Sequence, residues 1–556
     1  MSHTNQRNRR NEQKTATTDT GKQVANSRQP GKASKMLHRL FPYMVTFLAM
    51  WIFCFFIYGE VFVRTAEANF VTTDATQMKF LTDLSWGYAF WGARFLLLSY
   101  KSVWAGSIFL SLLLTLTAVL ADRALRMPRA WRGVSAIVPG AIAGWIIWRG
   151  TSIYYKNEPS LIYLVPVAAL IVTGIAAGLS AVIGSRQKKR QTAAGTSAVR
   201  PWGALVPLAV CAVLFCAVKI WNENVVLTAK MQNALLRGDY DTLIECGLDA
   251  RRPTRTVAAY YAIGLEQNDR LLDGIFDIPY DFPDPRLDKK DGSEEYGLFV
   301  SDCSFYCGLI NTAYHTALEH IVMNNPSLYY LKRLALCAIL NSEEKLAEKY
   351  LTLIGSVPFE TAFVEKYRPM IYNRSLVEAD PELSHVLSLY PQEERFEQYY
   401  RNPTFLGYNI GLMSGSDKTL ETAIAASLYT KDLTRSIIPI QILAQRNNGV
   451  LPTAVQQAIV LIAGSHPEVA QSFPGVVENM KPQLSAFYTE ATPIIKEGES
   501  AKQGKSEKQK AEIKQEYNRR LRKELRDDWL GTYFYYYYCE NNEPNQVRPA
   551  TNSGVN

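Results

Sequence analysis

Residues 41–63 read FPYMVTFLAMWIFCFFIYGEVFV, and this stretch decides the class of the fold. It is 23 residues long and carries no charged side chain before Glu60. At about 1.5 Å per residue, a helix of this length crosses the roughly 30 Å hydrocarbon core of a bilayer. The stretch therefore predicts a membrane-spanning helix.

Four more apolar runs follow before residue 223. We expect spanning helices, of which the third is the shortest, at Ser102–Ala121, Gly133–Trp148, Leu161–Gly184 and Trp202–Trp221. Nine of the ten tryptophans lie at or before Trp221, as expected of a membrane half, because tryptophan is enriched where lipid tails meet headgroups. Residues 37–222 are thus predicted to form a five-helix transmembrane domain.

One further segment, DLSWGYAFWGARFLLLSY at Asp83–Tyr100, is apolar and aromatic. Arg94 in its middle, together with Trp86, Tyr88 and Trp91, favours an amphipathic helix that lies in the membrane interface. A sixth crossing at this segment is the alternative, and it would move every later loop to the other side.

Positive charge is concentrated beside the apolar runs. Residues 1–36 carry a net charge of +6, residues 122–132 a net +3 and residues 185–201 a net +5. Since cytoplasmic loops are enriched in Lys and Arg, the three segments together predict a cytoplasmic N-terminus, with a basic disordered tail over residues 1–36. Five crossings then place the chain after about Asn222 outside the cytoplasm.

The rest of the chain is acidic. The overall charge is +8, so removing the three basic segments leaves a net −6. Nucleic-acid binding needs clustered Lys and Arg against phosphates, and this distribution excludes it as a function class.

Residues 223–495 change to amphipathic helical segments with short polar turns. Turns at Gly238-Asp239, Asn268-Asp269, Asn311-Thr312 and Asn341-Ser342 separate apolar helices. Intervals near 30–35 residues of helix, turn and helix are typical of a TPR-like α-solenoid. The predicted fold is therefore all-α, with an N-terminal bundle of five transmembrane helices followed by a TPR-like α-solenoid outer domain.

The end of the chain has its own composition. Residues 496–528 are rich in Lys, Glu, Arg and Gln and predict a solvated charged helix or linker. Residues 529–539 contain an aromatic run, Tyr533–Tyr538, which we expect to dock on the outer domain rather than to bind sugar. The polar residues 540–556 predict a disordered tail.

Two sets of side chains are candidate metal ligands. Cys303, Cys307, His315 and His320 are zinc-binding residue types, but on one helix the two histidines are too far from the cysteines for one ion. The acid-rich stretch with Asp281, Asp284, Asp288, Asp291, Glu294 and Glu295 lacks the order of a calcium loop. The sequence has no nucleophile elbow, HExxH, Walker loop or dinucleotide fingerprint, so we expect no enzyme, metal or cofactor.

Several features together resemble a known family. They are the basic tail, Tyr58-Gly59 at the end of the first helix, the five runs, the unit LYYLKRLA…EKLAEKYL within Leu328–Pro358, and WLGTYFYYYY at Trp529–Tyr538. They resemble an uncharacterised Bacteroidota family, domain of unknown function 6057. The resemblance implies a multi-pass inner-membrane protein with a periplasmic TPR-like domain, and it implies no activity.

The function favoured by these features is a membrane-anchored periplasmic interaction scaffold. A helical solenoid offers a surface for a protein partner, and the membrane lipid is the second partner. The alternative is an accessory or catalytic component of envelope polysaccharide or glycoconjugate assembly.

Overall fold

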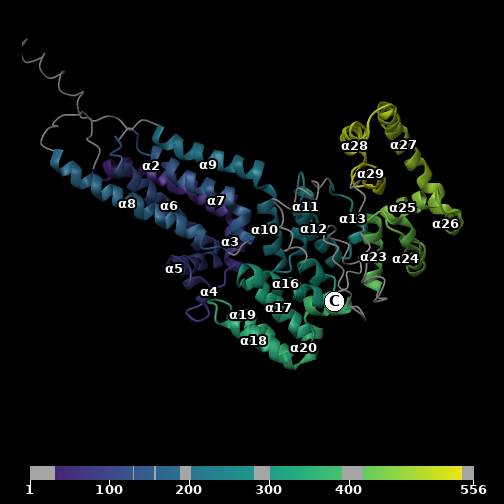
Figure 1. Cartoon of the computed structure of the whole chain (residues 1–556), viewed down its shortest axis with the longest axis horizontal. Helices are drawn as coiled ribbons and strands as arrows, with labels where there is room; N and C mark the ends of the chain where they lie inside the picture. The colour runs from purple at the N-terminus through teal and green to yellow at the C-terminus, as the bar shows by residue number, and fades with distance from the viewer. Residues whose placement is uncertain are drawn as a thin grey trace, which may run out of the picture.

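The computed structural model describes residues 32–128, 131–155, 158–187, 202–280, 301–390 and 417–540. Within these ranges the chain is helical, and extended pairing is limited to an isolated antiparallel bridge between Asn69 and Ser327. The predicted all-α class is confirmed. A bundle of long helices occupies one end of the molecule and a larger helical domain, the outer domain, occupies the other (Figure 1).

The bundle is built from the first half of the chain. Its elements are α2 (Lys32–Ile52), η1 (Phe53–Ile57), α6 (Val103–Ala124), η4 (Val134–Ala136), α7 (Ile137–Tyr155), α8 (Leu161–Gln187) and α9 (Trp202–Trp221). Four stretches are long and apolar enough to cross a membrane: Leu40–Ile57 in α2 and η1, Val103–Ala124 in α6, Leu161–Ile183 in α8 and Ala204–Trp221 in α9.

By length and apolar composition the described residues give four candidate spans rather than the predicted five, and the third predicted span is the one that does not qualify. The third predicted span, Gly133–Trp148, corresponds to an apolar helical stretch, Val134–Gly150, which is shorter than each of the four candidate spans. Its first turn is the 3₁₀ segment η4, and Arg149 limits its apolar part at the other end. Seventeen residues rise only about 26 Å, which is short of the hydrocarbon thickness.

The first predicted span ends earlier than expected. The chain passes through the π-helical turn η1, where the Tyr58 amide donates to the Phe53 carbonyl at 2.9 Å, and then breaks at Tyr58. A Cβ at Gly59 would lie 3.1 Å from the Cys54 carbonyl oxygen, so glycine permits this close approach. Residues up to Val63, predicted as membrane, belong to a separate helix, α3 (Gly59–Ala68).

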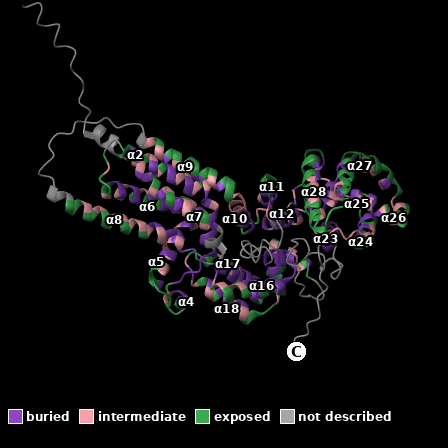
Figure 2. Cartoon of the chain, turned by 45° about the horizontal axis from the view of Figure 1, so that its top comes forward, coloured by how far each residue is buried: buried purple, intermediate pink, exposed green. Residues whose placement is uncertain are grey.

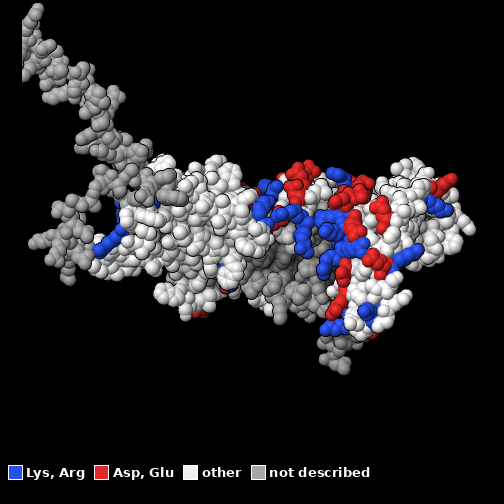
Figure 3. All heavy atoms as spheres, turned by 90° about the horizontal axis from the view of Figure 1, so that it is seen from above, with Lys and Arg blue, Asp and Glu red and all other residues white. Residues whose placement is uncertain are grey.

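The outer face of the bundle is apolar. Figure 2 shows α8 with long exposed stretches, and its exposed large side chains include Ile171, Val172, Ile175, Leu179 and Val182. On the face of the bundle seen in Figure 3, Lys and Arg are visible at the end away from the outer domain, whereas both signs of charge crowd the outer domain. The exposed apolar side chains on the outside of the bundle are unfavourable in contact with water, whereas contact with lipid tails is favourable.

The segment Asp83–Tyr100 folds beside the start of α8. It begins directly after α4 (Lys79–Thr82) and contains a turn, then α5 (Gly87–Leu97) and most of η2 (Leu98–Lys101). The eleven residues of α5 rise about 17 Å, which is too short to cross a bilayer. Arg94 is buried and donates to the Phe70 carbonyl at 2.9 Å, so protein rather than water satisfies this charge.

The outer domain follows α9 directly. Its helices are α10 (Glu223–Leu235), α11 (Tyr240–Asp249), α12 (Arg255–Gln267), α13 (Leu271–Gly274), α16 (Ile310–Asn324), α17 (Leu328–Leu340), α18 (Glu344–Gly355), α19 (Thr361–Tyr372), α20 (Arg374–Ala379), α21 (Pro381–Ser388), α23 (Asp417–Tyr429), α24 (Leu433–Arg446), α25 (Thr453–Ala463), α26 (Pro467–Ser472), α27 (Pro474–Lys502), α28 (Glu507–Trp529) and α29 (Tyr533–Cys539).

Helices that follow one another in sequence pack together, as in α11 with α12 and α17 with α18. Three of the four predicted turns lie between helices, where Gly238, Asp269 and Ser342 adopt positive φ. The turn expected at Asn311-Thr312 is wrong, because α16 already begins at Ile310 and the chain reverses at Gly308. A regular TPR-like superhelix stays a prediction.

One helix forms the centre of the outer domain. Every residue of α17 except Lys332 is buried, so this helix is covered on all sides by its neighbours. The three alanines of the clearest predicted unit, Ala335, Ala338 and Ala347, are fully buried at the contact of α17 with α18. Small side chains let the two helices approach closely.

The last three helices form an appended unit. α27 runs continuously through residue 495, and α28 folds back along it after a capping box at Ser506 and Gln509. Leu521 and Leu525 of the charged helix pack with Phe487, Trp529 and Phe534 in a small core. α29 is the aromatic run, and its Tyr533, Tyr535 and Tyr536 are buried.

A glycine at the contact of α11 with α12 gives a test of this packing. A Cβ at Gly247 would lie 2.3 Å from the Tyr261 ring, which is fixed because its hydroxyl donates to the Gly274 carbonyl at 2.7 Å. We expect Gly247→Ala to destabilise the protein by about 1–3 kcal/mol through overpacking. The measurement is thermal unfolding of the full chain in detergent, followed by circular dichroism.

The matched control is Gly475→Ala in the first turn of α27, where no atom lies within 4 Å of the added Cβ. Alanine there should leave stability unchanged or raise it by about 0.5–1 kcal/mol. Equal effects of the two substitutions would contradict the packing described.

Candidate functional site

Four charged side chains meet where the bundle joins the outer domain. Lys101 at the end of η2 lies 3.0 Å from Glu67 of α3 and 2.5 Å from Glu360, which precedes α19. Lys332 of α17 lies 2.7 Å from Glu360 and 3.7 Å from Glu67. We call Glu67, Lys101, Lys332 and Glu360 the ion quartet. Its two positive and two negative charges balance, and Glu360 is only 4% exposed.

The ion quartet connects segments that are distant in the sequence. Glu67 and Lys101 come from the part of the chain interleaved with the bundle helices, whereas Lys332 and Glu360 belong to the outer domain. Removing the four charged side chains from water is costly. Their close pairing offsets this cost only when the bundle and the outer domain are arranged so that each lysine lies beside a glutamate. The ion quartet therefore fixes how the two halves sit against each other.

A second polar group lies deeper in the same joint. Arg64 of α3 donates from Nε to the Gln232 side-chain oxygen at 2.7 Å, and the Gln232 amide donates to the Tyr260 hydroxyl at 2.5 Å. The Tyr260 hydroxyl in turn donates to Asp302 at 2.5 Å. This chain of hydrogen bonds leads from α3, which follows the first candidate span, to the centre of the outer domain.

Asp302 is the acceptor on which this network converges. It is fully buried and accepts from the Tyr329 hydroxyl and, at 2.9 Å, from Arg333 Nη2. The Arg64 guanidinium lies 3.9 Å from the centre of the Tyr329 ring, and that of Arg333 lies 3.8 Å from the centre of the Phe305 ring. We call Arg64, Gln232, Tyr260, Asp302, Tyr329 and Arg333 the buried network.

The protonation of the buried network follows from its surroundings. Burial and the Asp302 carboxylate raise the pKa of the Tyr329 hydroxyl, so this group stays a donor at neutral pH. The network holds two guanidinium groups and one carboxylate, of which only Arg333 pairs directly with Asp302, and the aromatic rings compensate the remaining positive charge by cation–π contact. The arrangement holds helices together and leaves no reactive group exposed to a substrate.

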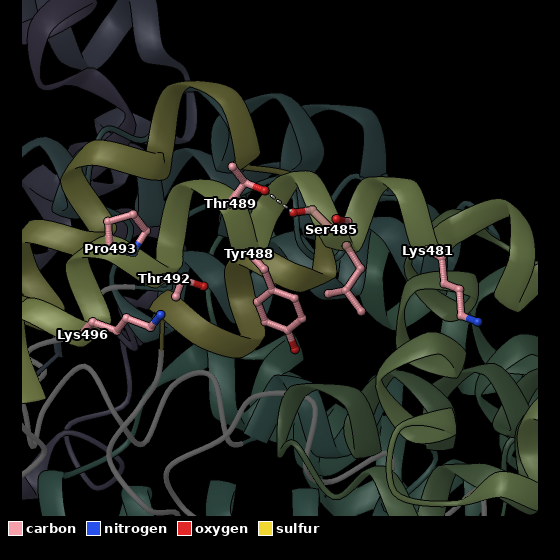
Figure 4. A pocket seen from close by; sticks show the side chains of 8 residues that line it. Lys481, Ser485, Tyr488, Thr489, Thr492, Pro493 and Lys496 are labelled. Carbon is pink, nitrogen blue, oxygen red and sulfur yellow. Dashed lines mark hydrogen bonds between the residues drawn. The ribbon is translucent and has the colours of Figure 1, made fainter.

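Open grooves lie on the described part of the outer domain. The first, of about 540 Å³, lies along α27 and is lined by Lys481, Leu484, Ser485, Tyr488, Thr489, Thr492, Pro493 and Lys496. Figure 4 shows the lysines at opposite ends of this row with Tyr488 between them. The Tyr488 hydroxyl bonds that of Tyr538 at 2.6 Å, which ties the groove wall to the end of α29.

The second groove, of about 740 Å³, lies at the ends of several helices. It is lined by Asn311, Leu340, Asn341, Glu343, Arg374, Glu378, Ser384, Leu387, Ser388 and Tyr390. Asn341 donates to Asn311 at 2.9 Å, and Arg374 donates to the Leu340 carbonyl at 2.8 Å and so caps α17. We call this the helix-end groove. Its lining offers both donors and acceptors to a bound chain.

The four zinc-type residues considered from the sequence do not come together. Cys303 and Cys307 share one helical turn, and burial raises the pKa of both thiols. His320 of α16 stacks on Tyr330 at 4.1 Å, whereas His315 of the same helix is exposed. Among the described residues, no three His, Cys, Asp or Glu side chains form a group that could hold a metal ion.

Two other predicted features have different outcomes. The acid-rich stretch from Asp281 to Glu295 lies outside the described residues. The aromatic run forms α29, in which the Tyr533 hydroxyl donates to the Leu428 carbonyl at 3.0 Å and that of Tyr536 to the Tyr429 carbonyl at 2.6 Å. These rings pack on the outer domain, so they do not form an open platform.

Sequence reasoning missed the ion quartet and the buried network. The available signal was charge in an apolar setting: Lys332 and Arg333 interrupt the otherwise apolar helix LYYLKRLALCAIL, and Arg64 follows the first span closely. Such residues indicate buried pairing. The sequence could not identify their partners, because the ion quartet joins segments that are far apart in the chain: its two glutamates, Glu67 and Glu360, are separated by 293 positions.

The ion quartet makes the stability of the joint depend on pH. Burial alone would raise the pKa of Glu67, but Lys101 and Lys332 lower it by more, so it lies below its ordinary value. Its contribution is complete above the unfolded pKa of about 4.3 and is lost as the pH falls through the folded pKa. We expect Glu67→Gln to cost about 2 kcal/mol at pH 7 and progressively less below about pH 4.

Thermal unfolding of both proteins in detergent from pH 7 to pH 3 measures this difference. The control is Glu499→Gln, which removes an exposed pair with Lys502 and should change stability by at most about 1 kcal/mol. A difference between wild type and Glu67→Gln that stays constant across the pH range would rule out the ionic role of Glu67.

Comparison with known proteins gives a family and no activity. The chain matches the family described as "Family of unknown function (DUF6057)" over residues 34–217 and 150–540. No curated protein and no solved structure matches the chain. Since the matched residues cover most of the sequence, the chain belongs to this family of unknown function, DUF6057.

Proposed function

We propose that the protein is a membrane-anchored interaction scaffold that binds a segment of a partner protein in the helix-end groove. The observation that carries the proposal is this groove, whose lining of side-chain amides, hydroxyls, two carboxylates and a guanidinium suits the backbone and polar side chains of a peptide. The ion quartet and the buried network support it, because they hold the groove at a fixed place relative to the bundle.

The course of α7 supports a fifth crossing in the proposed topology. A Cβ at Gly140 of α7 would meet Val210 of α9, and one at Gly150 would approach the Asn222 side chain just after α9. The two helices therefore run parallel and level over this distance. If α9 crosses the bilayer, α7 crosses beside it, and its packing in the bundle compensates for its shorter apolar length.

Contacts at the end of the bundle away from the outer domain support the proposed orientation. The Tyr43 hydroxyl donates to Asp122 at 2.7 Å, so the start of the first candidate span lies beside the end of α6. Arg126 donates to the Ser180 hydroxyl at 2.8 Å, which brings the end of α8 to the same place. The described residues from which the three basic segments continue therefore meet at one end of the bundle, which by the positive-inside rule is the cytoplasmic end.

On this basis the outer domain lies on the opposite side of the membrane. In a cell with two membranes, such as the Bacteroidota that the resemblance suggests, the bundle lies in the inner membrane and the outer domain in the periplasm. The TPR-like character of the outer domain belongs to the same proposal. It rests on neighbouring helix pairs such as α17 with α18.

Reporter fusions test the orientation. Alkaline phosphatase, which is active only outside the cytoplasm, should be active when fused after Asn556 and inactive when fused after Gln187 at the end of α8. Green fluorescent protein at the same two positions should give the reverse pattern. Phosphatase activity at Gln187 together with fluorescence at Asn556 would invert the proposed topology.

Charge reversal in the helix-end groove tests the scaffold role. Glu378 is exposed on α20 and lines the groove, so Glu378→Arg should place a second cation beside Arg374 and reduce recovery of the partner at least tenfold, which corresponds to about 1.4 kcal/mol. The measurement is affinity purification of the full chain from detergent-solubilised membranes, with bound proteins quantified by mass spectrometry.

The matched control is Glu365→Arg, which makes the same change of charge at an exposed residue of α19 that does not line the groove. It should leave partner recovery unchanged. Equal loss with both variants, or no specific partner with the wild type at physiological salt, would argue against the proposed scaffold.

A further inference from the structure

Aromatic side chains mark the level at which the bundle meets the outer domain. Trp104 at the start of α6, Trp148 near the end of α7 and Trp221 at the end of α9 are all exposed. Tryptophan is enriched at the boundary between hydrocarbon and headgroups. With the membrane crossing proposed above, these three residues lie at the lipid headgroup layer on the side of the outer domain.

Two more aromatic residues stand out near this level because of their backbone. Trp86, just before α5, has φ of 67° and is 83% exposed, and Phe359, between α18 and α19, has φ of 71° and is 73% exposed. Positive φ is strained for bulky side chains, and large exposed apolar rings are unfavourable in water. Both positions therefore expose an aromatic ring although the backbone conformation and contact with water disfavour it.

Buried polar contacts hold Phe359 close to the bundle. The next residue, Glu360, bonds Lys101, which precedes Trp104 by three positions. Ser356, three residues before Phe359, donates to Gln77 at 2.8 Å, so the turn between α18 and α19 lies beside the segment leading into α4. Figure 1 shows α4 and α5 on the bundle side of the outer domain, with α19 next to them.

The turn that presents Trp86 is equally constrained. The Gly87 amide donates to the Leu84 carbonyl at 2.9 Å, and a Cβ at Gly87 would lie 2.2 Å from the Leu81 carbonyl oxygen. Leu84 and Tyr88 are exposed on either side of Trp86. Behind this turn, Trp91 donates to the Thr72 carbonyl at 2.9 Å, which fixes α5 to the preceding segment.

We infer that Trp86 and Phe359 insert into the lipid headgroup layer, so that the outer domain rests on the bilayer through a second, interfacial contact besides the spanning helices. The occupant is lipid, because these rings lie next to the lipid-facing surface of the bundle and at its tryptophan level. The inference rests on the proposed membrane crossing. It extends that proposal by assigning a lipid contact to the outer domain itself through Phe359.

Photocrosslinking in the membrane tests this contact. The photoreactive residue p-benzoylphenylalanine replaces Trp86 or Phe359 in the full chain, since each position already holds an aromatic ring. Ile175, exposed on α8, is the position expected to face lipid tails, and Val450, exposed between α24 and α25, is the distant control. The proteins are reconstituted in phosphatidylethanolamine–phosphatidylglycerol nanodiscs and irradiated, and lipid adducts are quantified by mass spectrometry.

We expect lipid adducts at positions 86 and 359 with yields near that at 175 and several-fold above that at 450. Adducts at 175 without adducts at 86 and 359 would overturn the interfacial contact and leave the membrane anchor standing. Lack of adducts at 175 as well would reject the membrane proposal and this inference together. In native membranes, protein adducts in place of lipid at 86 and 359 would overturn the inference in favour of a protein-binding surface.

Discussion

Charge buried between the bundle and the outer domain determines how the rest of the molecule is arranged. The ion quartet balances two lysines against two glutamates in a region that is largely shielded from water. Such pairs add little net stability, because desolvation cancels most of the attraction. Their effect is on specificity: displacing either half would leave buried charges without partners, and this penalty excludes other arrangements.

The buried network extends the same constraint inward. Arg64 follows the break at Tyr58, and the change of direction there brings α3 out of line with α2 and against α10 and α17. If the first span had continued as a straight helix to Val63, Arg64 would have stayed near the bundle axis and Asp302 would have lost its link through Gln232 and Tyr260. The buried network therefore depends on the break in the helix at Tyr58.

The sequence predicted what depends on composition and missed what depends on distant contacts. Apolar length located α2, α6, α8 and α9, and helical periodicity with alanines at close contacts located α17 and α18. The third predicted span falls short of the other four because its apolar helical stretch, Val134–Gly150, has only seventeen residues. The turn at Asn311 was misplaced because asparagine is common in turns, whereas Gly308, with φ of 79°, actually reverses the chain.

The candidate site illustrates the same limit more strongly. Lys332 and Arg333 were visible as charges in an apolar helix, but one faces Glu360 and the other faces Asp302, and no local pattern distinguishes these partners. The helix-end groove has no sequence signature at all. Its lining comes from helix termini between Asn311 and Tyr390, and such termini become neighbours only after the domain has folded.

The length of α17 links the joint to the groove. Ser327, just before this helix, donates to the Ala68 carbonyl at the end of α3, and Leu340 at the other end lines the groove. Thirteen residues separate the two sites by about 20 Å along the helix axis. Because α17 is buried on all sides and clamped at its start, this spacing cannot change without unpacking the outer domain. A partner bound in the groove, as proposed, would therefore be held at a set distance from the joint, and a shift of the joint would be transmitted to the groove along a rigid helix.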